Sequence, residues 1–477
     1  MPTATQDAKG GANAATWRSA LLCLLLVPVS VYWQLSMETV RNSTHPSALS
    51  LPFHVVFILL CVTGANRLWA RFVSPRTALS TGELLLTYSV LAISSAVAGV
   101  DTLQVMIPAI TYGFRNAGAN GWESFTPLLP PSLTISDPAI FERYYIGYGS
   151  VWLPAIRAAW LPVVLRWTGF VTLLLWVMLC INAVLRRAWT ENEKLTFPVV
   201  QLPLQLVEPV TWSRAGLFGS GVFWCGFLVA AVPDMFNSLN FLFPGVPPMG
   251  YTGNGYSYVD MRYVKGLEQY LAHPPLSAMG ETPLSFYPMV IGLGVLMPLD
   301  FLASVPLFYW GWKAQKVLTV ALALDLNPRF PFTEFQSLGA YLSFFILSLF
   351  VARPHLRLVW QKACGKRDAI DDAAEPMPYA LAVWGGLAGV AALVWFTGAM
   401  GLTWWVGVLF FVIYFALAIA ITRMRAELGT PVHDLHQCGP DMVLTRLAGS
   451  RAFDDSNLVA LGMLGAFNQA YRSHPMP

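Results

Sequence analysis

Apolar residues fill long stretches of this chain, and short groups of polar residues separate them. Several stretches reach the roughly 20 residues that a helix needs to cross a bilayer. Backbone groups in such a stretch must be satisfied within it, so each is predicted to be a helix. The sequence therefore predicts an all-α, polytopic transmembrane helical bundle of roughly nine to eleven spans. Nine stretches stand out, at residues 19–38, 52–70, 84–110, 165–185, 215–233, 286–311, 335–352, 379–398 and 402–422.

The third and sixth stretches are long enough to be tilted or broken. Pro108 lies near the end of the third, and Pro298 lies inside the sixth; proline interrupts the hydrogen bonding of a helix. The apolar patch at 317–324 is too short to span and is predicted to be re-entrant. Residues 151–165 mix tryptophan, arginine and apolar side chains, which predicts a helix lying in the membrane interface.

Basic residues predict the orientation, because positively charged loops stay on the cytoplasmic side. Arg67, Arg71 and Arg76 follow the second span, and Arg186 and Arg187 follow the fourth. This places the N-terminus in the cytoplasm and the protein in the plasma (inner) membrane. The basic group at 353–367 would then lie outside, which indicates a missed or re-entrant crossing between residues 313 and 335.

Composition supports a chain that is solvated by lipid. Hydrophobic residues make up 56% and charged residues 12%, about half the charged share of a typical soluble domain. The net charge of +3 is accounted for by topology, and no nucleic-acid partner is expected. The expected organisation is a disordered tail at 1–16, a transmembrane domain at 17–452 and a C-terminal segment at 453–477, in a chain that continues in a longer protein.

Charged residues inside a membrane are costly, so they are functional candidates. Asp101 and Gln104 fall in the third stretch and Asp300 in the sixth. We predict that they line a substrate or ion path; the alternative is that the two acids face lipid headgroups. Glu83 follows Ser80 by three residues, a pattern that favours helix capping.

Two further polar segments are candidates for gating or for an ordered loop. The first runs from Thr190 to Pro198 and contains Glu191 and Glu193. Thr190 and Glu193 have the spacing of a capping box, and Pro198 would break a helix. The simpler interpretation of this segment is a cytoplasmic turn.

The second polar segment is the densest one, at 423–441. Arg423 and Glu427 are four residues apart, so on a helix they share a face and can form an ion pair. The segment also holds four side chains of transition-metal ligand types, although their spacing is not a known metal signature: His433, Asp434, His436 and Cys438. The alternative to a metal or proton site is an ordered loop that closes a cavity.

Motifs for nucleotide, flavin or hydrolase chemistry are absent from the sequence, which has no Walker A, GxSxG, HExxH or GxGxxG pattern. We expect no cofactor. A secondary transporter needs none of these motifs; it needs acids and broken helices near the middle of the membrane.

The element from Glu193 to Pro198, with the Val-Gln-Leu-Pro stretch that follows, resembles a segment of the oligopeptide transporter superfamily. The late Arg-x-Arg-Ala-Glu-x-Gly-x-Pro element at 423–431 and the stretch 468–477 look like uncharacterised bacterial multi-pass proteins, known only as a domain of unknown function. The first resemblance implies transport, whereas the second gives no information about activity.

The leading hypothesis is a secondary transporter or permease for a small organic or peptide-like solute, with the lipid bilayer, the solute and a coupling ion as partners. The second hypothesis is a membrane-embedded enzyme of the lipid-linked glycosyltransferase type. Such enzymes carry an acid in the first outer loop; residues 41–50 contain none, and Asp101 would substitute. The third is a non-catalytic membrane scaffold. The sequence leaves the oligomeric state open.

Overall fold

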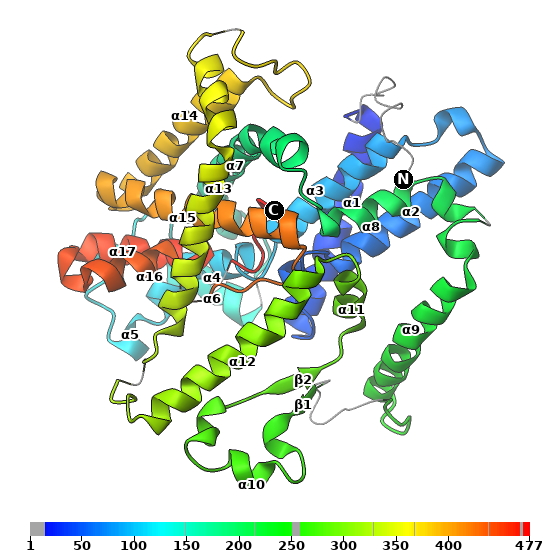
Figure 1. The fold of residues 1–477 in the computed structure, drawn as a ribbon. Coiled ribbons are helices and arrows are strands. Elements are labelled where there is room, and N and C mark those ends of the chain that lie inside the picture. The colour runs from blue at the N-terminus through cyan, green and yellow to red at the C-terminus, as the bar shows by residue number, and fades with distance from the viewer. Residues whose placement is uncertain are drawn as a thin grey trace.

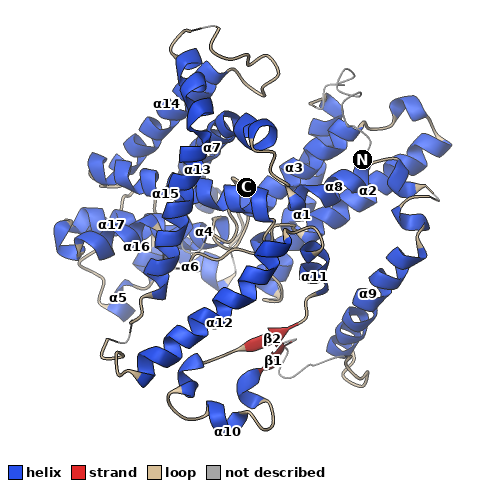
Figure 2. Cartoon of the chain, in the orientation of Figure 1, coloured by secondary structure: helices blue, strands red, loops and turns tan. Residues whose placement is uncertain are grey.

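A computed structural model describes residues 15–147, 149–213, 215–249, 258–327, 329–366, 368–436, 438–467 and 471–477 (Figure 1). Helices dominate this part of the chain, and the strands form one small two-stranded sheet (Figure 2). Most of the predicted disordered tail, residues 1–14, lies outside the described residues.

The described chain contains seven helices that are long and apolar enough to cross a membrane. Two of them end in a π-helical turn, so that α1 (Trp17–Leu35) continues to Val40 and α7 (Pro154–Arg187) continues to Asn192. The other five are α2 (Phe53–Phe72), α9 (Gly221–Leu242), α13 (Thr333–Ala363), α14 (Tyr379–Gly398) and α15 (Trp404–Leu428). This confirms an all-α integral membrane protein.

Two predicted spans are broken helices, as their length indicated; Pro298 marks the break in the sixth, whereas Pro108 lies inside a helix of the third. The third consists of α3 (Thr81–Val97) and α4 (Leu103–Arg115), and residues 98–102 separate the two. The sixth consists of α11 (Pro288–Gly294) and α12 (Leu299–Ala321), with Pro298 immediately before α12. Ser80 and Glu83 form the predicted capping box at the start of α3.

Two predicted elements are wrong. The patch at 317–324 is not re-entrant, because residues 317–321 complete the last turns of α12. Residues 151–165 do not form a separate interface helix: α7 begins at Pro154 and runs without interruption through Pro162. A proline in the first turn of a helix costs no backbone hydrogen bond, and an internal one can bend a helix without ending it.

Shorter elements complete the structure. The remaining helices are α5 (Ala117–Asn120), α6 (Pro138–Ile146), α8 (Pro198–Val207), α10 (Glu268–Leu271), α16 (Pro440–Ala448) and α17 (Asp455–Leu464). Strands β1 (Tyr258–Asp260) and β2 (Pro283–Ser285) pair antiparallel, with Val259 opposite Leu284.

Most of the long helices belong to two groups that meet near the centre of the molecule, whereas α9 stands apart from both (Figure 1). Helices α7, α13, α14 and α15 pack on one another, and so do α1, α2 and α3. Helix α8 contacts α2, α3 and α15, so it bridges the two groups. The end of the described chain, labelled C in Figure 1, lies between them.

Helices α7 and α14 pack closely along their length. Gly385 and Gly389 stand one turn apart, and the carbonyl of Gly385 accepts a 3.0 Å hydrogen bond from Trp176 Nε1. A Cβ added at Gly389 would lie 2.6 Å from Cγ2 of Val177. Paired small residues let transmembrane helices approach this closely.

Candidate functional site

Four segments from distant parts of the sequence meet where the third span is broken. They are the loop at 41–52, the break at 98–102, the segment at 429–436 and the segment at 471–477, and we call their meeting point the central junction. Ser50 N donates to the carbonyl of Pro431 at 2.8 Å, and Leu49 and Val432 form an isolated β-bridge. The break in the third span is therefore held by tertiary contacts.

Asp101 lies inside the central junction and is 8% exposed. Its carboxylate accepts a 2.8 Å hydrogen bond from the backbone N–H of Arg472, and its own N–H donates to Ser473 Oγ at 3.1 Å. A Cβ added at Gly99 would lie 2.5 Å from Cβ of Ser473 and 2.8 Å from Cβ of Ser47. Glycine is therefore what allows the 471–477 segment to lie against the break.

In the central junction, and on the end of α15 beside it, are buried polar atoms that have no hydrogen-bond partner among the described residues. They are Arg425 Nη2, Thr430 Oγ1, Tyr471 OH and His474 Nε2. Arg425 Nε donates to His433 Nδ1 at 3.2 Å, and the other ring nitrogen of His433 bonds the carbonyl of Tyr471. Buried polar atoms usually have partners, so this group is a place where a polar molecule could bind.

Gln104 also lies near the break, and it contacts Glu38, an acid that the sequence analysis did not identify as a candidate. Its Nε2 donates to Glu38 at 2.5 Å and to the carbonyl of Ala98 at 2.9 Å. Glu38 is 3% exposed, although it closes an apolar span. An ionisable residue in the last turn of that span, four residues after Gln34, was the signal that could have identified it.

The two polar segments that the sequence singled out separately lie against each other. Arg423, 9% exposed, pairs with Glu193 at 2.6 Å and with Glu427 at 2.8 Å. The expected pair of Arg423 and Glu427 is present, and Glu193 completes a triad. The buried ring of Trp189 lies 5.9 Å from the Arg423 guanidinium carbon, within the range of a cation–π contact.

The turn before α8 docks on the end of α15. Phe197 N donates to the carbonyl of Ala426, and Thr196 Oγ1 donates to the carbonyl of Glu427, both at 2.9 Å. Pro198 starts α8, as a proline at the first helical position does. Gly429 has a φ of +69°, and an added Cβ there would lie 2.6 Å from Cβ of Pro198. Thr190 is not an N-cap, because it lies in the π-turn that ends α7 and its hydroxyl donates to the carbonyl of Arg186.

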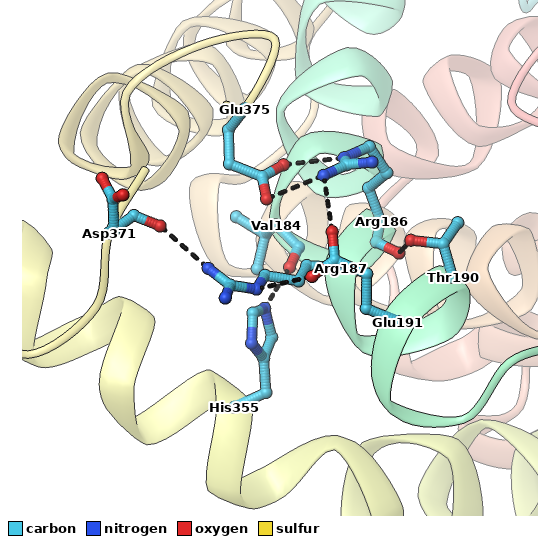
Figure 3. A network of polar contacts seen from close by, with 8 residues as sticks. All are labelled: Val184, Arg186, Arg187, Thr190, Glu191, His355, Asp371 and Glu375. Atoms are coloured by element: carbon cyan, nitrogen blue, oxygen red, sulfur yellow. Dashed lines mark hydrogen bonds and ion pairs between the residues drawn. The ribbon is translucent and has the colours of Figure 1, made fainter. Parts of the chain in front are cut away.

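Glu191 belongs to a network at the end of α7 (Figure 3). It pairs with Arg186 at 3.3 Å and with Arg187 at 3.0 Å. Arg186 also binds both carboxylate oxygens of Glu375, at 2.7 and 2.9 Å, and Arg187 donates to the carbonyl of Asp371 at 2.8 Å. The network ties the end of α7 to the loop between α13 and α14.

Glu375 is the buried member of this network, with a side chain that is 2% exposed. Its hydrogen bonds to the Arg186 guanidinium hold the pKa of the carboxyl below its ordinary value. The nearby Asp372 also has a lowered pKa, because its carboxylate accepts from the backbone N–H of Tyr379. Both carboxyls are therefore charged at neutral pH.

Three of the four candidate metal ligands take separate partners. Buried His433 bonds Arg425 and the carbonyl of Tyr471, Asp434 pairs with Arg472 at 2.8 Å, and Cys438 Sγ donates to the carbonyl of Glu334 at 3.3 Å. His436 is exposed. Across the described ranges, no three His, Cys, Asp or Glu side chains are placed to hold a metal ion.

Asp300 stands apart from the central junction. It is exposed in the first turn of α12, where its carboxylate accepts from the N–H of Phe301. The structure brings Asp101 and Gln104 to the same break and leaves Asp300 outside it. Of the two acids that the sequence placed in the membrane, only Asp101 is enclosed.

An apolar cavity of about 480 Å³ opens between α4, α6 and α7. Its walls include Met106, Ile110, Trp160 and Trp167, and Arg143 is part of its lining. A cavity of this size and lining suits an apolar ligand.

The long apolar helices, the two broken spans and the buried polar junction define an integral membrane protein with a polar centre. The chain belongs to the family described as Family of unknown function (DUF6785), whose model matches residues 9–477. No curated protein and no solved structure matches it.

Proposed function

We propose that the protein is a secondary transporter and that its solute binds at the central junction. The observation that supports this most directly is the meeting, between two groups of helices, of a helix break, the buried Asp101 and polar atoms that have no partner among the described residues. In transporters, substrates bind near the middle of the membrane where discontinuous helices expose their ends.

The chemistry of the junction favours a zwitterionic solute. Asp101 offers a carboxylate, which pairs with a cationic amine. Arg425 Nη2 is a buried donor without a partner among the described residues, and a guanidinium suits a carboxylate. An amino acid or a short peptide carries both groups, which agrees with a small organic or peptide-like solute.

Alternating access provides a test that does not require the solute to be known. In a background without the six native cysteines, Ser473→Cys places a thiol at the junction. A membrane-impermeant thiol reagent is added to one side or the other of sealed vesicles. In a transporter the thiol should be labelled from both sides of the membrane, because the binding site opens to each side in turn. Leu393→Cys is the control, since Leu393 is fully buried on α14, which is not one of the segments that form the junction.

The outcome separates three functions. Labelling of Ser473→Cys from both sides, with Leu393→Cys unlabelled, supports transport. Labelling from neither side contradicts transport and favours a scaffold. Labelling from one side alone also contradicts transport and favours an enzyme.

A membrane-embedded enzyme with a lipid-linked substrate is the second candidate. The observation that favours it is the apolar cavity between α4, α6 and α7, which offers room for a hydrocarbon chain. Asp101 precedes α4, the helix that supplies part of the cavity wall.

A further inference from the structure

Glu38 is a buried acid that pairs with neutral groups in the described structure. Its carboxylate accepts from three neutral groups: Ser47 N at 2.8 Å, Gln34 Nε2 at 3.1 Å and Gln104 Nε2 at 2.5 Å. No ion pair joins Glu38 to a basic residue within the described part of the chain. A buried carboxylate without a counter-ion is costly in a membrane protein.

Two unused oxygen atoms lie beside this acid. Gln34 and Ser95 are both fully buried, and neither Gln34 Oε1 nor Ser95 Oγ has a hydrogen-bond partner among the described residues. The Gln34 amide lies between Glu38 and α3, since its Nε2 also donates to the carbonyl of Ser95 at 3.0 Å. The site therefore combines one carboxylate, one amide oxygen, one hydroxyl and one backbone carbonyl.

The backbone around Glu38 also favours a positive charge. Ser95 lies in the last turn of α3, which ends at Val97. The C-terminal end of a helix carries partial negative charge, and the ends of broken helices bind cations in transporters. Glu38 itself lies in the π-turn Ser36–Val40, a local distortion that is frequent at functional sites.

We infer that Glu38, Gln34 and Ser95 bind a monovalent cation of the Na⁺ class at the end of α3. Hard cations prefer oxygen ligands. Rotating the Gln34 amide by a half-turn exchanges the positions of Nε2 and Oε1, so that Oε1 lies beside the Glu38 carboxylate. The carbonyl of Ser95 then no longer accepts a hydrogen bond from Gln34 and is free to bind the cation. One carboxylate balances one positive charge, whereas a divalent ion would leave an excess charge buried.

The assignment of this cation as the coupling ion of a transporter rests on the proposed function. The site lies next to the central junction, because Gln104 contacts both Glu38 and Ala98 at the break. Ser47 gives a second connection: its N–H binds Glu38 and its hydroxyl accepts from Val100 N at 3.3 Å. Occupancy of the cation site therefore acts on the backbone that precedes Asp101.

The test is the thermal unfolding midpoint of the purified protein in equal concentrations of NaCl, KCl and choline chloride. A ligand that binds the folded state raises the midpoint, and we expect Na⁺ to raise it by at least about 2 °C over choline. Glu38→Gln should abolish the difference. Glu191→Gln is the matched control, because Glu191 is half-exposed and paired with Arg186 and Arg187; it should keep the full Na⁺ response.

Ser95→Ala keeps the test decisive if Glu38→Gln does not fold. The Ser95 hydroxyl has no partner among the described residues, so its removal should leave the midpoint in choline unchanged and reduce the Na⁺ response. An unchanged Na⁺ response in Ser95→Ala and Glu38→Gln, or no Na⁺ response in the wild type, overturns the inference. A midpoint that depends on pH but not on Na⁺ assigns the site to a proton and overturns it as well.

The two proposals fail separately. Na⁺ stabilisation that is lost in Glu38→Gln, together with labelling of Ser473→Cys from neither side, leaves the cation site standing and rejects transport. Labelling from both sides without any Na⁺ response rejects the cation site alone.

Discussion

The carboxylate of Asp101 accepts a 2.8 Å hydrogen bond from the backbone N–H of Arg472, 371 positions further along the chain. The side chain of Arg472 continues the connection, because its Nη2 donates to Asp434 at 2.8 Å. One residue thus joins the broken third span to the segment that follows α15. The conformation of the break depends on this long-range contact.

Asp101→Ala should destabilise the protein by about 1–3 kcal/mol, because the buried N–H of Arg472 loses its acceptor. Asp300→Ala is the control, and we expect it to cost less than about 1 kcal/mol, since Asp300 is exposed. Unfolding in denaturant measures both. Equal losses in the two variants would contradict the assignment of Asp101 to a tertiary contact.

Arg423→Gln should cost up to about 3 kcal/mol, because it leaves Glu193, whose side chain is 15% exposed, without its cation. Glu427→Gln should cost no more than about 1 kcal/mol, since the Glu427 side chain is 40% exposed. The double variant Arg423→Gln/Glu193→Gln should recover part of the loss, which a double-mutant cycle measures. Strictly additive losses would show that Arg423 and Glu193 do not interact.

Stability should fall in acid through Glu375. Its pKa is lower in the folded protein than its ordinary value of 4.5, so the pair with Arg186 stabilises the fold above about pH 4.5 and is lost as pH falls through the lowered pKa. Glu375→Gln removes this contribution. The difference in unfolding midpoint between wild type and Glu375→Gln should be largest at neutral pH and should shrink in acid. A difference that is independent of pH argues against a charged pair.

Gly389→Ala should destabilise the packing of α7 on α14 by about 1–3 kcal/mol, because the new Cβ would overlap Val177. Gly398→Ala in the same helix is the matched control. A Cβ there meets no described atom within 4 Å, so the change should be neutral or gain up to about 1 kcal/mol. If both variants unfold at the same point, the two helices do not depend on close approach at Gly389.

The sequence predicted the helices well because bilayer length and backbone satisfaction constrain them strongly. The length of the stretches indicated the breaks at 98–102 and before α12, and Pro298 marked the second; Pro108 did not mark the first, because it lies inside α4. The sequence did not predict that α7 is continuous, because a mixture of tryptophan and arginine is typical both of a helix in the membrane interface and of the first turns of a long span. Local composition does not determine whether a helix ends.

The site was harder to predict, because its contacts join residues that are far apart in the chain. Asp101 and Gln104 were identified from charge and polarity alone, and so was the pair of Arg423 and Glu427. The third member of that triad, Glu193, was assigned to a turn, since nothing local indicates that α8 brings it to α15. Glu38 was overlooked because it closes a span, where an acid is usually solvated by headgroups.

The position of the 471–477 segment between the two groups of helices bears on how the protein is made. All seven apolar helices leave the ribosome before Tyr471 does, so each group can insert while the centre is still open. The break after α3 then acquires the partner of Asp101 only when Arg472 arrives. We expect chains that stop before residue 471 to insert in the membrane with their two groups of helices poorly joined, and to be degraded faster than chains that include this segment.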